Sequence, residues 1–407
     1  MQRLLASMMM LLMMTAALAG CAGSDITQDD VDAARAEGKA EGIAETTIVS
    51  TLDVIHERGS MNCGVKSEQW GMGYLADENS QYTGLDVEYC KAIAAAIGLD
   101  ETTDITYVYA SGSERFNLLR DGEIDVLIRT TTWTTSRDAD LNADFGGINF
   151  FDGQAILVNG EKLANDGTPS IYDLAGLSIC VATGTTTEGN IQDFISDWDS
   201  SWGAAPTAGV YDDATAARAG FTGGSCDAYT GDNSAMAAYK WQLDGEGGAQ
   251  ECAMKVTDAD GNPTTECVDL WIAAEYISKE PLTSAVRDYD TEWKEVVQWV
   301  WFGMVTAEEM GLTSTNLANA PDDTATTRFL TGSPWLGTET NPVPANFMTL
   351  VLEAVGNYGE AYDRSFCDGQ FDGLSGSEGM QNCVLERKGT ENALVSEGGL
   401  MYAPAWR

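Results

Sequence analysis

The chain has 407 residues, 44% of them hydrophobic, and a formal net charge of −41 at pH 7. This length exceeds one ordinary hydrophobic core, so we expect two lobes. The 63 acidic residues against 22 basic ones exclude a nucleic-acid-binding protein, because no basic stripe is available to neutralise phosphates. They also disfavour electrostatic attachment to anionic lipids. We interpret the acidic excess as a solvated surface, since no clustered ligand motif supports the alternative of a cation site.

The N-terminus has the pattern of an export signal. A basic residue precedes the apolar run Leu4–Leu18, which is too short for a membrane-spanning helix. The run ends in a sequence that resembles a lipobox, so we predict that residues 1–21 are a lipoprotein signal peptide and that Cys21 is lipidated. The alternative is an ordinary cleaved signal with an incidental cysteine. We expect the polar residues 22–50 to be a tether, with the protein outside the cytoplasmic membrane, in the periplasm or at the cell surface.

The next block alternates strand and helix patterns, which predicts a parallel sheet covered by helices. The expected elements are helix 51–58, strand 61–65, helix 84–98, strand 105–108, helix 113–120 and strand 126–128.

The order repeats in a second block, so we predict a second α/β lobe. Its expected elements are strand 177–182, helices 187–197 and 213–220, strand 226–229 and a polar insertion near 244–267. After this block we expect strand 282–286, helices 291–303 and 306–310 and a helical region at 345–356. We expect crossovers between the lobes near 155–160 and 275–282. Residues 51–157 and 282–407 are therefore assigned to lobe 1, and 158–281 to lobe 2.

The cysteine count suits an exported protein with disulfides. Eight cysteines remain after Cys21, which is an even number. Many connectivities are possible, and local spacing favours Cys63 with Cys90, Cys180 with Cys226, Cys252 with Cys267 and Cys367 with Cys383. A metal site is the alternative, but the chain has no CxxC motif and a single histidine. We therefore predict neither a metal nor a cofactor.

The segment that ends at Arg137 carries the clearest functional signal. Threonines and Arg137 follow the apolar residues 126–128, at the end of an expected strand. Ligands bind at the carboxyl ends of strands in open α/β sheets, and hydroxyls with a guanidinium suit a carboxylate. Arg137 can grip a carboxylate bidentately, with Thr132 and Thr134 as further donors. The alternative for Arg137 is a surface ion pair with a neighbouring aspartate.

Two features of the second block complement this segment. A Thr-Gly-Thr-Thr run that contains Thr185 and Thr186 follows a strand and opens a helix, where free N–H groups attract anions. Plain N-capping is the alternative. Asp232 follows a strand-like segment and can accept an ammonium, or it is a turn or N-cap residue. An Arg clamp that faces an Asp is what an α-amino acid zwitterion requires.

Aromatic and catalytic candidates are fewer. Trp70 and Tyr74 can stack on a ligand, although most aromatic residues belong to the core. Arg129 is unusual at the end of an apolar strand, where it lines the cleft or pairs with a buried acid. His56 is the only histidine, and neither GxSxG nor HExxH occurs. We therefore predict that the protein is not an enzyme.

Several motifs, in the same order, resemble the family 3 extracellular solute-binding proteins of ABC importers, and most closely the general L-amino-acid-binding branch of the polar amino acid uptake class. The matching stretches are Gly84–Ala94, Glu114–Phe116, Gly122–Val126, Thr131–Asp138, Gly184–Glu188, Cys226–Asp232, Ile277–Pro281, Val355–Glu360 and Gly398–Pro404. Two departures are Tyr89, where the family helix usually has an aliphatic residue or Phe, and the Trp70–Tyr74 stretch, which differs in residues and length.

The resemblance implies a type II periplasmic-binding-protein fold, in which two α/β lobes joined by a two-strand hinge close on an amino acid. It implies that Arg137, Thr132 and Thr134 hold the α-carboxylate with help from Thr186, and that Asp232 takes the α-ammonium. We expect a monomeric, lipid-anchored protein that captures L-amino acids and passes them to the permease of an ABC importer.

Two alternatives remain open at this point. One is an enzyme on the same scaffold, such as a small-acid dehydratase with Glu188 as its acid/base group. The other is a ligand-sensing domain that acts through a receptor.

Overall fold

The computed structural model describes residues 49–163, 170–245, 252–258, 260–332, 336–375 and 379–407. Cys21, the predicted signal peptide and most of the predicted tether lie outside these residues and stay predictions. Residues from Ser50 to Arg407 form one compact unit. Among the described helices, none combines the length and the apolar character that crossing a membrane requires.

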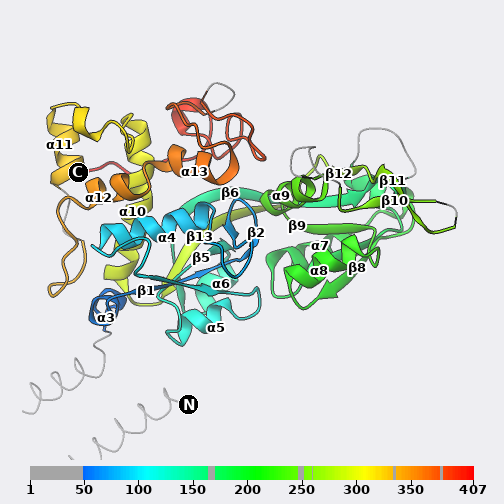
Figure 1. The fold of residues 1–407 in the computed structure, drawn as a ribbon. Coiled ribbons are helices and arrows are strands. Elements are labelled where there is room, and N and C mark those ends of the chain that lie inside the picture. The colour runs from blue at the N-terminus through cyan, green and yellow to red at the C-terminus, as the bar shows by residue number, and fades with distance from the viewer. Residues whose placement is uncertain (1–48, 164–169, 246–251, 259, 333–335, 376–378) are drawn as a thin grey trace, which may run out of the picture. The chain divides into compact units, whose positions relative to one another are not determined.

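One nine-stranded sheet runs through this unit (Figure 1). Its centre is made by two long antiparallel strands, β6 (Ala143–Asn159) and β13 (Ser278–Arg287), which we call the connecting strands. On the β13 side the order is β5 (Val126–Thr132), β1 (Met61–Val65) and β4 (Ile105–Tyr109). On the β6 side it is β9 (Ala228–Asp232), β7 (Ser178–Ala182) and β8 (Thr207–Tyr211), and β12 (Leu270–Ile272) also pairs with β6.

Each outer group of three strands is parallel within itself and carries its own helices. The first lobe, built on β4, β1 and β5, has helices α3 (Thr51–Arg58), α4 (Leu85–Ala96), α5 (Arg115–Arg120), α6 (Thr135–Asp140), α10 (Thr291–Glu309), α11 (Thr324–Thr331), α12 (Phe347–Ala354) and α13 (Tyr358–Phe366). The second lobe, built on β9, β7 and β8, has α7 (Thr186–Ser196), α8 (Ala214–Thr222) and α9 (Asn233–Leu243).

Smaller elements complete the chain. Two hairpins are β2 (Glu68–Gln69) with β3 (Gly73–Tyr74) and β10 (Lys255–Thr257) with β11 (Pro263–Cys267). The short 3-10 helices are η1 (Gly160–Lys162), η2 (Ile171–Leu174), η3 (Ser200–Trp202), η4 (Leu317–Asn319) and η5 (Val395–Glu397).

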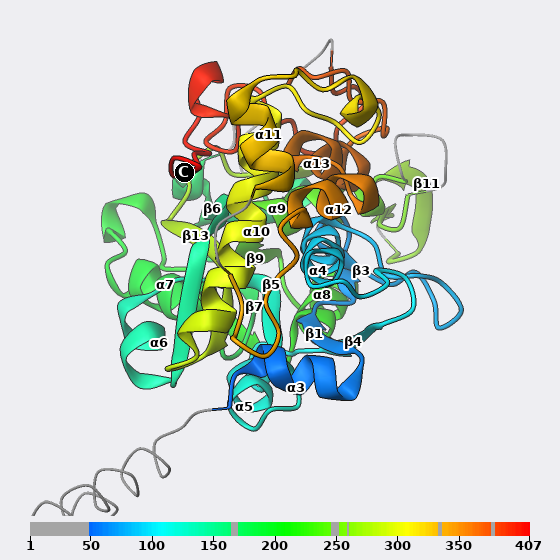
Figure 2. The same ribbon diagram turned by 90° about the vertical axis from the view of Figure 1, so that its left-hand side faces the viewer.

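Each lobe has a hydrophobic core of its own. In the first lobe, α10, α12 and α13 pack around α4 (Figure 2), and Trp293 and Trp301 are fully buried there. Separate clusters around Phe221 and around Val181 fill the two faces of the second lobe's strands. The two-lobed α/β fold predicted from the sequence is therefore confirmed, while the exact residue limits of the lobes stay predictions.

The departure at Tyr89 has a physical reason. Its ring is fully buried on α4, and its hydroxyl donates a hydrogen bond of 2.7 Å to the carbonyl of Val297 on α10. A buried phenol needs such a partner, so this tyrosine joins two helices that an aliphatic residue would join by packing alone.

Four disulfides join the pairs that local spacing favoured. Cys63 on β1 is bonded to Cys90 on α4, and Cys180 on β7 to Cys226 just before β9. The other two, Cys252–Cys267 and Cys367–Cys383, close short segments of the second lobe and of the C-terminal region.

Several predicted elements were wrong in extent. The helices expected at 291–303 and 306–310 are one helix, α10, in which the Thr306 hydroxyl donates to the Phe302 carbonyl at 2.7 Å. This bond inside the helix accommodates a residue that favours other conformations. Helices α9, α11 and α13 were not predicted, and the described part of the insertion forms the β10–β11 hairpin.

The predicted end of the strand at residue 128 was also wrong. The strand β5 continues through the first threonines to Thr132. Thr130 interrupts its regularity with φ of +39°, a conformation that is unusual for a β-branched residue, and its N–H donates to Asp86 at 3.1 Å. Strained backbone of this kind is concentrated at functional sites.

A buried ion pair ties the C-terminal segment to α10. Arg387 is 0% exposed, and it donates from both Nη atoms to Glu308, with a bond of 2.8 Å from Nη1 to Oε2. Its guanidinium also lies 4.8 Å from the centre of the Tyr358 ring.

We predict that Arg387→Met lowers the free energy of unfolding by about 3–5 kcal/mol, because it leaves the Glu308 carboxylate buried without a counter-charge. The double variant Glu308→Leu with Arg387→Met should recover much of this loss. Urea denaturation of the three proteins measures both effects, and equal losses in the single and double variants would contradict the prediction.

Candidate functional site

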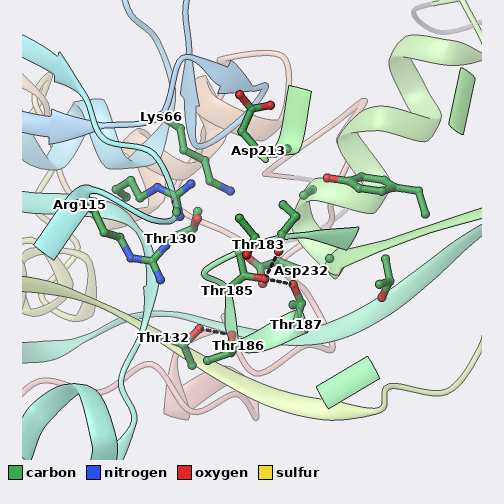
Figure 3. A pocket seen from close by; sticks show the side chains of 18 of the residues that line it. Lys66, Arg115, Thr130, Thr132, Thr183, Thr185, Thr186, Thr187, Asp213 and Asp232 are labelled. Carbon is green, nitrogen blue, oxygen red and sulfur yellow. Dashed lines mark hydrogen bonds between the residues drawn. The ribbon is translucent and has the colours of Figure 1, made fainter. Parts of the chain in front are cut away.

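A cavity lies between the lobes, at the carboxyl ends of β1, β5, β7 and β9 (Figure 3). The first lobe contributes Lys66, Tyr109, Gly112, Arg115, Arg129, Thr130, Thr132 and Arg137. The second lobe contributes Ala182, Thr183, Thr185, Thr186, Thr187, Asp213, Ala214, Tyr229, Thr230, Gly231, Asp232, Ala235 and Tyr239. Charged and hydroxyl side chains dominate this lining, which suits a small polar ligand.

Four cationic side chains of the first lobe are buried in this cavity. The exposed fractions are 7% for Lys66, 2% for Arg115, 5% for Arg129 and 8% for Arg137. Among the described residues, every hydrogen bond that these cations donate ends on a neutral oxygen, and none of them forms an ion pair. Buried charges are normally paired, so this cluster favours the binding of an anion.

The individual bonds explain how the four cations are held. Lys66 Nζ donates to Gln69 Oε1 at 2.5 Å, and Arg129 Nε donates to the carbonyl of Ala110 at 2.8 Å. Arg137 Nη1 donates at 2.9 Å to the carbonyl of Thr132, on the strand just before it. A fourth bond, of 3.4 Å, runs from Arg115 Nη2 across the cavity to the carbonyl of Gly184.

The pKa shifts of the cavity cations agree with a site that binds an anion. Burial lowers the pKa of Lys66 to about 8, and the nearby Arg129 lowers it further in the same direction. Burial also lowers the pKa of Arg137 to about 10, again with Arg129 adding to the effect. The pKa of Arg115 lies well below its ordinary value, because of burial and then of the charges on Arg129 and Arg137. A bound carboxylate would relieve all of these shifts.

Asp232 faces the cations from the second lobe. It ends β9 and precedes α9, but its side chain makes no capping hydrogen bond to that helix. Burial raises its pKa, and the charge of Lys66 opposes that shift. The carboxylate therefore remains available to a ligand ammonium.

A buried carboxylate on a connecting strand joins the two lobes. Glu280 on β13 is 1% exposed, and its Oε2 accepts hydrogen bonds from Thr132 of the first lobe at 2.5 Å and from Thr186 of the second lobe at 2.7 Å. Its Oε1 accepts from Asn190 at 2.8 Å and from Ser278 at 2.6 Å. The two threonine hydroxyls are thus engaged by the protein itself.

Comparison with known proteins identifies the family of this chain. The sequence model of the family described as bacterial extracellular solute-binding proteins, family 3, matches residues 61–314. The chain belongs to this family.

Individual members of family 3 cover nearly the whole chain. The glutamate/glutamine/aspartate/asparagine-binding protein BztA of Rhodobacter capsulatus is 35% identical over 90% of this chain and 96% of its own length. The general L-amino acid-binding periplasmic protein AapJ of Rhizobium johnstonii is 33% identical over 89% and 95%. A solved periplasmic binding protein from Brucella ovis with glutathione bound is 32% identical, with a TM-score of 0.72 over 88% of this chain and all of that one. The resemblance inferred from the sequence motifs is confirmed.

The cavity of this family 3 protein brings together most, but not all, of the predicted site residues. Arg137, Thr132, Thr185, Thr186 and Asp232 line it. Thr185 also caps α7, because its hydroxyl accepts from the N–H of Glu188 at 3.1 Å.

Three predicted residues do not line it. Thr134 instead caps α6, where its hydroxyl accepts from the N–H of Arg137 at 3.2 Å. Trp70 packs on Trp241, with 4.6 Å between ring centres, and Tyr74 lies in the β2–β3 hairpin. The aromatic residues that do line the cavity are Tyr109, Tyr229 and Tyr239, which sequence reasoning missed.

Sequence reasoning also missed Lys66 and Arg115. The available signals were the position of Lys66, directly after the first predicted strand, and the position of Arg115 within the motif Glu114–Phe116. A lysine after a strand is ordinarily a solvated residue, and this one is buried by segments of both lobes.

We predict that Glu280→Ala lowers the free energy of unfolding by about 1–3 kcal/mol for each threonine hydroxyl that stays buried without an acceptor. Glu280→Gln keeps one acceptor oxygen and should lose less. Ser278→Ala removes a single donor to the same carboxylate and serves as the matched control. Thermal and urea unfolding provide the measurement, and an alanine variant as stable as the wild type would refute the interpretation.

Proposed function

We propose that this protein is an extracytoplasmic substrate-binding lipoprotein that captures L-amino acids and delivers them to an ABC importer. The observation that carries the proposal is the arrangement of opposite charges across one cavity, with Arg137 on the first lobe and Asp232 on the second. An α-amino acid presents a carboxylate and an ammonium a few bonds apart, so one ligand can engage both lobes at once.

Arg137 takes the α-carboxylate in this proposal. Its guanidinium is aligned by the Thr132 carbonyl, and the first turn of α7 offers N–H groups at Thr186 and beyond, because such groups have no partner inside a helix. Asp232 takes the α-ammonium from the opposite side. The side chains of Thr132 and Thr186 contribute mainly by holding Glu280, and through it the connecting strands, in place.

Closure about the connecting strands follows from this geometry. A ligand that bonds to both lobes stabilises the state in which they are close, and a ligand that reaches one lobe alone does not. The closed state is the form that we propose the permease recognises.

The named relatives support the ligand class. BztA is described as binding glutamate, glutamine, aspartate and asparagine, and AapJ as binding L-amino acids generally. Glutathione, bound in the protein from Brucella ovis, carries an α-amino acid group at its γ-glutamyl end. An α-amino acid group is common to all of these ligands, so a site that recognises this group is what the relatives support for the present chain.

Binding without turnover fits the cavity better than catalysis. The carboxylate of Glu188, the acid/base candidate for a dehydratase, accepts hydrogen bonds from the Gly184 N–H at 2.9 Å and the Thr183 hydroxyl at 3.1 Å. It is not among the residues that line the cavity. A group held in this way stabilises the loop before α7 and is poorly placed to move a substrate proton.

We predict that Arg137→Ala and Asp232→Asn each weaken L-amino acid binding by about tenfold to a hundredfold or more, because each leaves an opposite ligand charge unpaired in a buried site. Arg120→Ala, which removes an exposed arginine, is the control and should bind normally. Calorimetric titration and thermal shift measure the effect, since a ligand at ~100 times its Kd adds ~2.7 kcal/mol of stability. An Arg137→Ala protein that binds as tightly as the wild type would rule out this assignment.

We also predict that Cys21→Ser releases the protein from the membrane fraction of cells, because the thiol is the proposed site of lipid attachment. Fractionation and mass spectrometry of the mature N-terminus test this directly. An unmodified N-terminus in the wild type would favour an ordinary cleaved signal.

A further inference from the structure

Three buried cations remain in the cavity once Arg137 is assigned to the α-carboxylate. Lys66, Arg115 and Arg129 line the same space, and the acidic residues that line it are Asp213 and Asp232. Asp86 and Glu280 lie close behind, but Asp86 accepts from the Thr130 N–H and the oxygens of Glu280 accept from side chains of both lobes. A neutral zwitterion would therefore leave the lining with more cations than anions.

Lys66, Arg115 and Arg129 are each held by a single hydrogen bond. The two arginines donate to main-chain carbonyls, and the Lys66 ammonium donates to a side chain, the amide oxygen of Gln69 at 2.5 Å. An ammonium has three donors, so two remain for a ligand. The Gln69 amide is itself oriented by the second lobe, because its Nε2 donates to the Ser234 hydroxyl at 3.0 Å.

The position of Lys66 separates it from the proposed α-carboxylate site. Figure 3 shows Lys66 and Asp213 at one end of the cavity, Thr132 and Thr186 at the other, and Asp232 between them. Arg137 is bonded to the Thr132 carbonyl, so a ligand held by Arg137 and Asp232 would leave the Lys66 end of the cavity for its side chain. The carboxylate of Asp213 is occupied in part by the cap of α8, where it accepts from the Ala216 N–H at 2.7 Å.

We propose that Lys66 binds a second carboxylate on the ligand, so that the site prefers acidic amino acids over their amides. This inference rests on the proposed function, and it names a substrate class within it. An ammonium buried beside arginines gains most from a ligand that brings a negative charge, whereas an amide brings only a dipole. Lys66 is thus the residue that determines whether the site prefers an acidic amino acid or its amide.

The test compares L-glutamate with L-glutamine, by calorimetric titration at pH 7, in the wild type, Lys66→Met and Lys66→Arg. We expect the wild type to prefer glutamate by at least about tenfold, and Lys66→Met to lose about tenfold to a hundredfold in glutamate affinity while glutamine affinity changes little. Lys66→Arg keeps the charge and should keep the preference. Lys162→Met, at an exposed lysine of the second lobe, is the matched control.

A pH series gives a second readout that a merely structural role would not move. The Lys66 pKa of about 8 reflects burial first and then Arg129, with Asp232, Glu68 and Asp86 opposing. Raising the pH from 7 to 9 removes most of the positive charge of Lys66, so the ratio of wild-type affinity for glutamate to that for glutamine should fall. Loss of the proton from the ligand's own α-ammonium weakens both ligands alike and leaves this ratio unchanged. Lys66→Arg should show no such fall.

Three results would overturn the inference. One is equal affinity of the wild type for glutamate and glutamine. Another is a Lys66→Met variant, shown to be folded, that weakens both ligands alike, because Lys66 would then act only through the positions of other residues. The third is failure of the wild type to bind any amino acid, which would overturn the proposed function as well. In the first two outcomes amino acids still bind, so the proposed function stands and only the role of Lys66 fails.

Discussion

The hydrogen bonds that converge on Glu280 connect the sheet, the cavity and the motion proposed for this protein. A carboxylate at 1% exposure is stable only where donors surround it. Here the donors come from Thr132 on one lobe, Thr186 on the other and Ser278 on the same strand. Because β13 pairs with both β5 and β6, this carboxylate links the cavity to the strands that run between the lobes.

The cavity reverses the electrostatic character of the chain around it. The protein as a whole carries a net charge of −41, yet its interlobe cavity concentrates four buried cations that form no ion pair among the described residues and outnumber the two acidic residues of the lining. Unpaired buried charge is costly to the folded protein, and that cost is recovered when an anionic group enters. In the proposed function, an anionic ligand supplies the interactions that these desolvated cations do not find within the chain, and this gain contributes to ligand affinity.

Opposite charges are also divided between the lobes. The cations belong to the first lobe and Asp232 to the second, so the zwitterion that we propose as ligand would complete an interaction that neither lobe can make alone. This division is a physical reason for closure around a ligand, and it agrees with the membership of family 3. The disulfides do not oppose such closure. Cys63–Cys90 and Cys180–Cys226 each join segments within one lobe, and neither bond involves the connecting strands.

The sequence by itself determined the fold class and the alternation of strands and helices, because these depend on local patterns. Local spacing favoured the cysteine pairs without deciding among the possible connectivities, and the tertiary structure decided them. Hydrophobic periodicity sets the elements, and Arg137, Thr186 and Asp232 stand at the ends or starts of such elements. Only the tertiary structure decided the surroundings of these residues. Trp70 faces Trp241 and not the cavity, since a contact across 171 positions of sequence sets its place.

Lys66 illustrates the same limit. Nothing next to it in sequence predicts its burial, which arises when residues near 110, 129 and 232 close around it. Burial, the pKa shift and the choice of hydrogen-bond partner are properties of the assembled neighbourhood, since desolvation depends on every chain segment within a few ångströms. Local patterns contain no information about that neighbourhood. The sequence therefore placed Arg137 and Asp232 at the ends of strands, while the folded chain decided which charged groups lie around them.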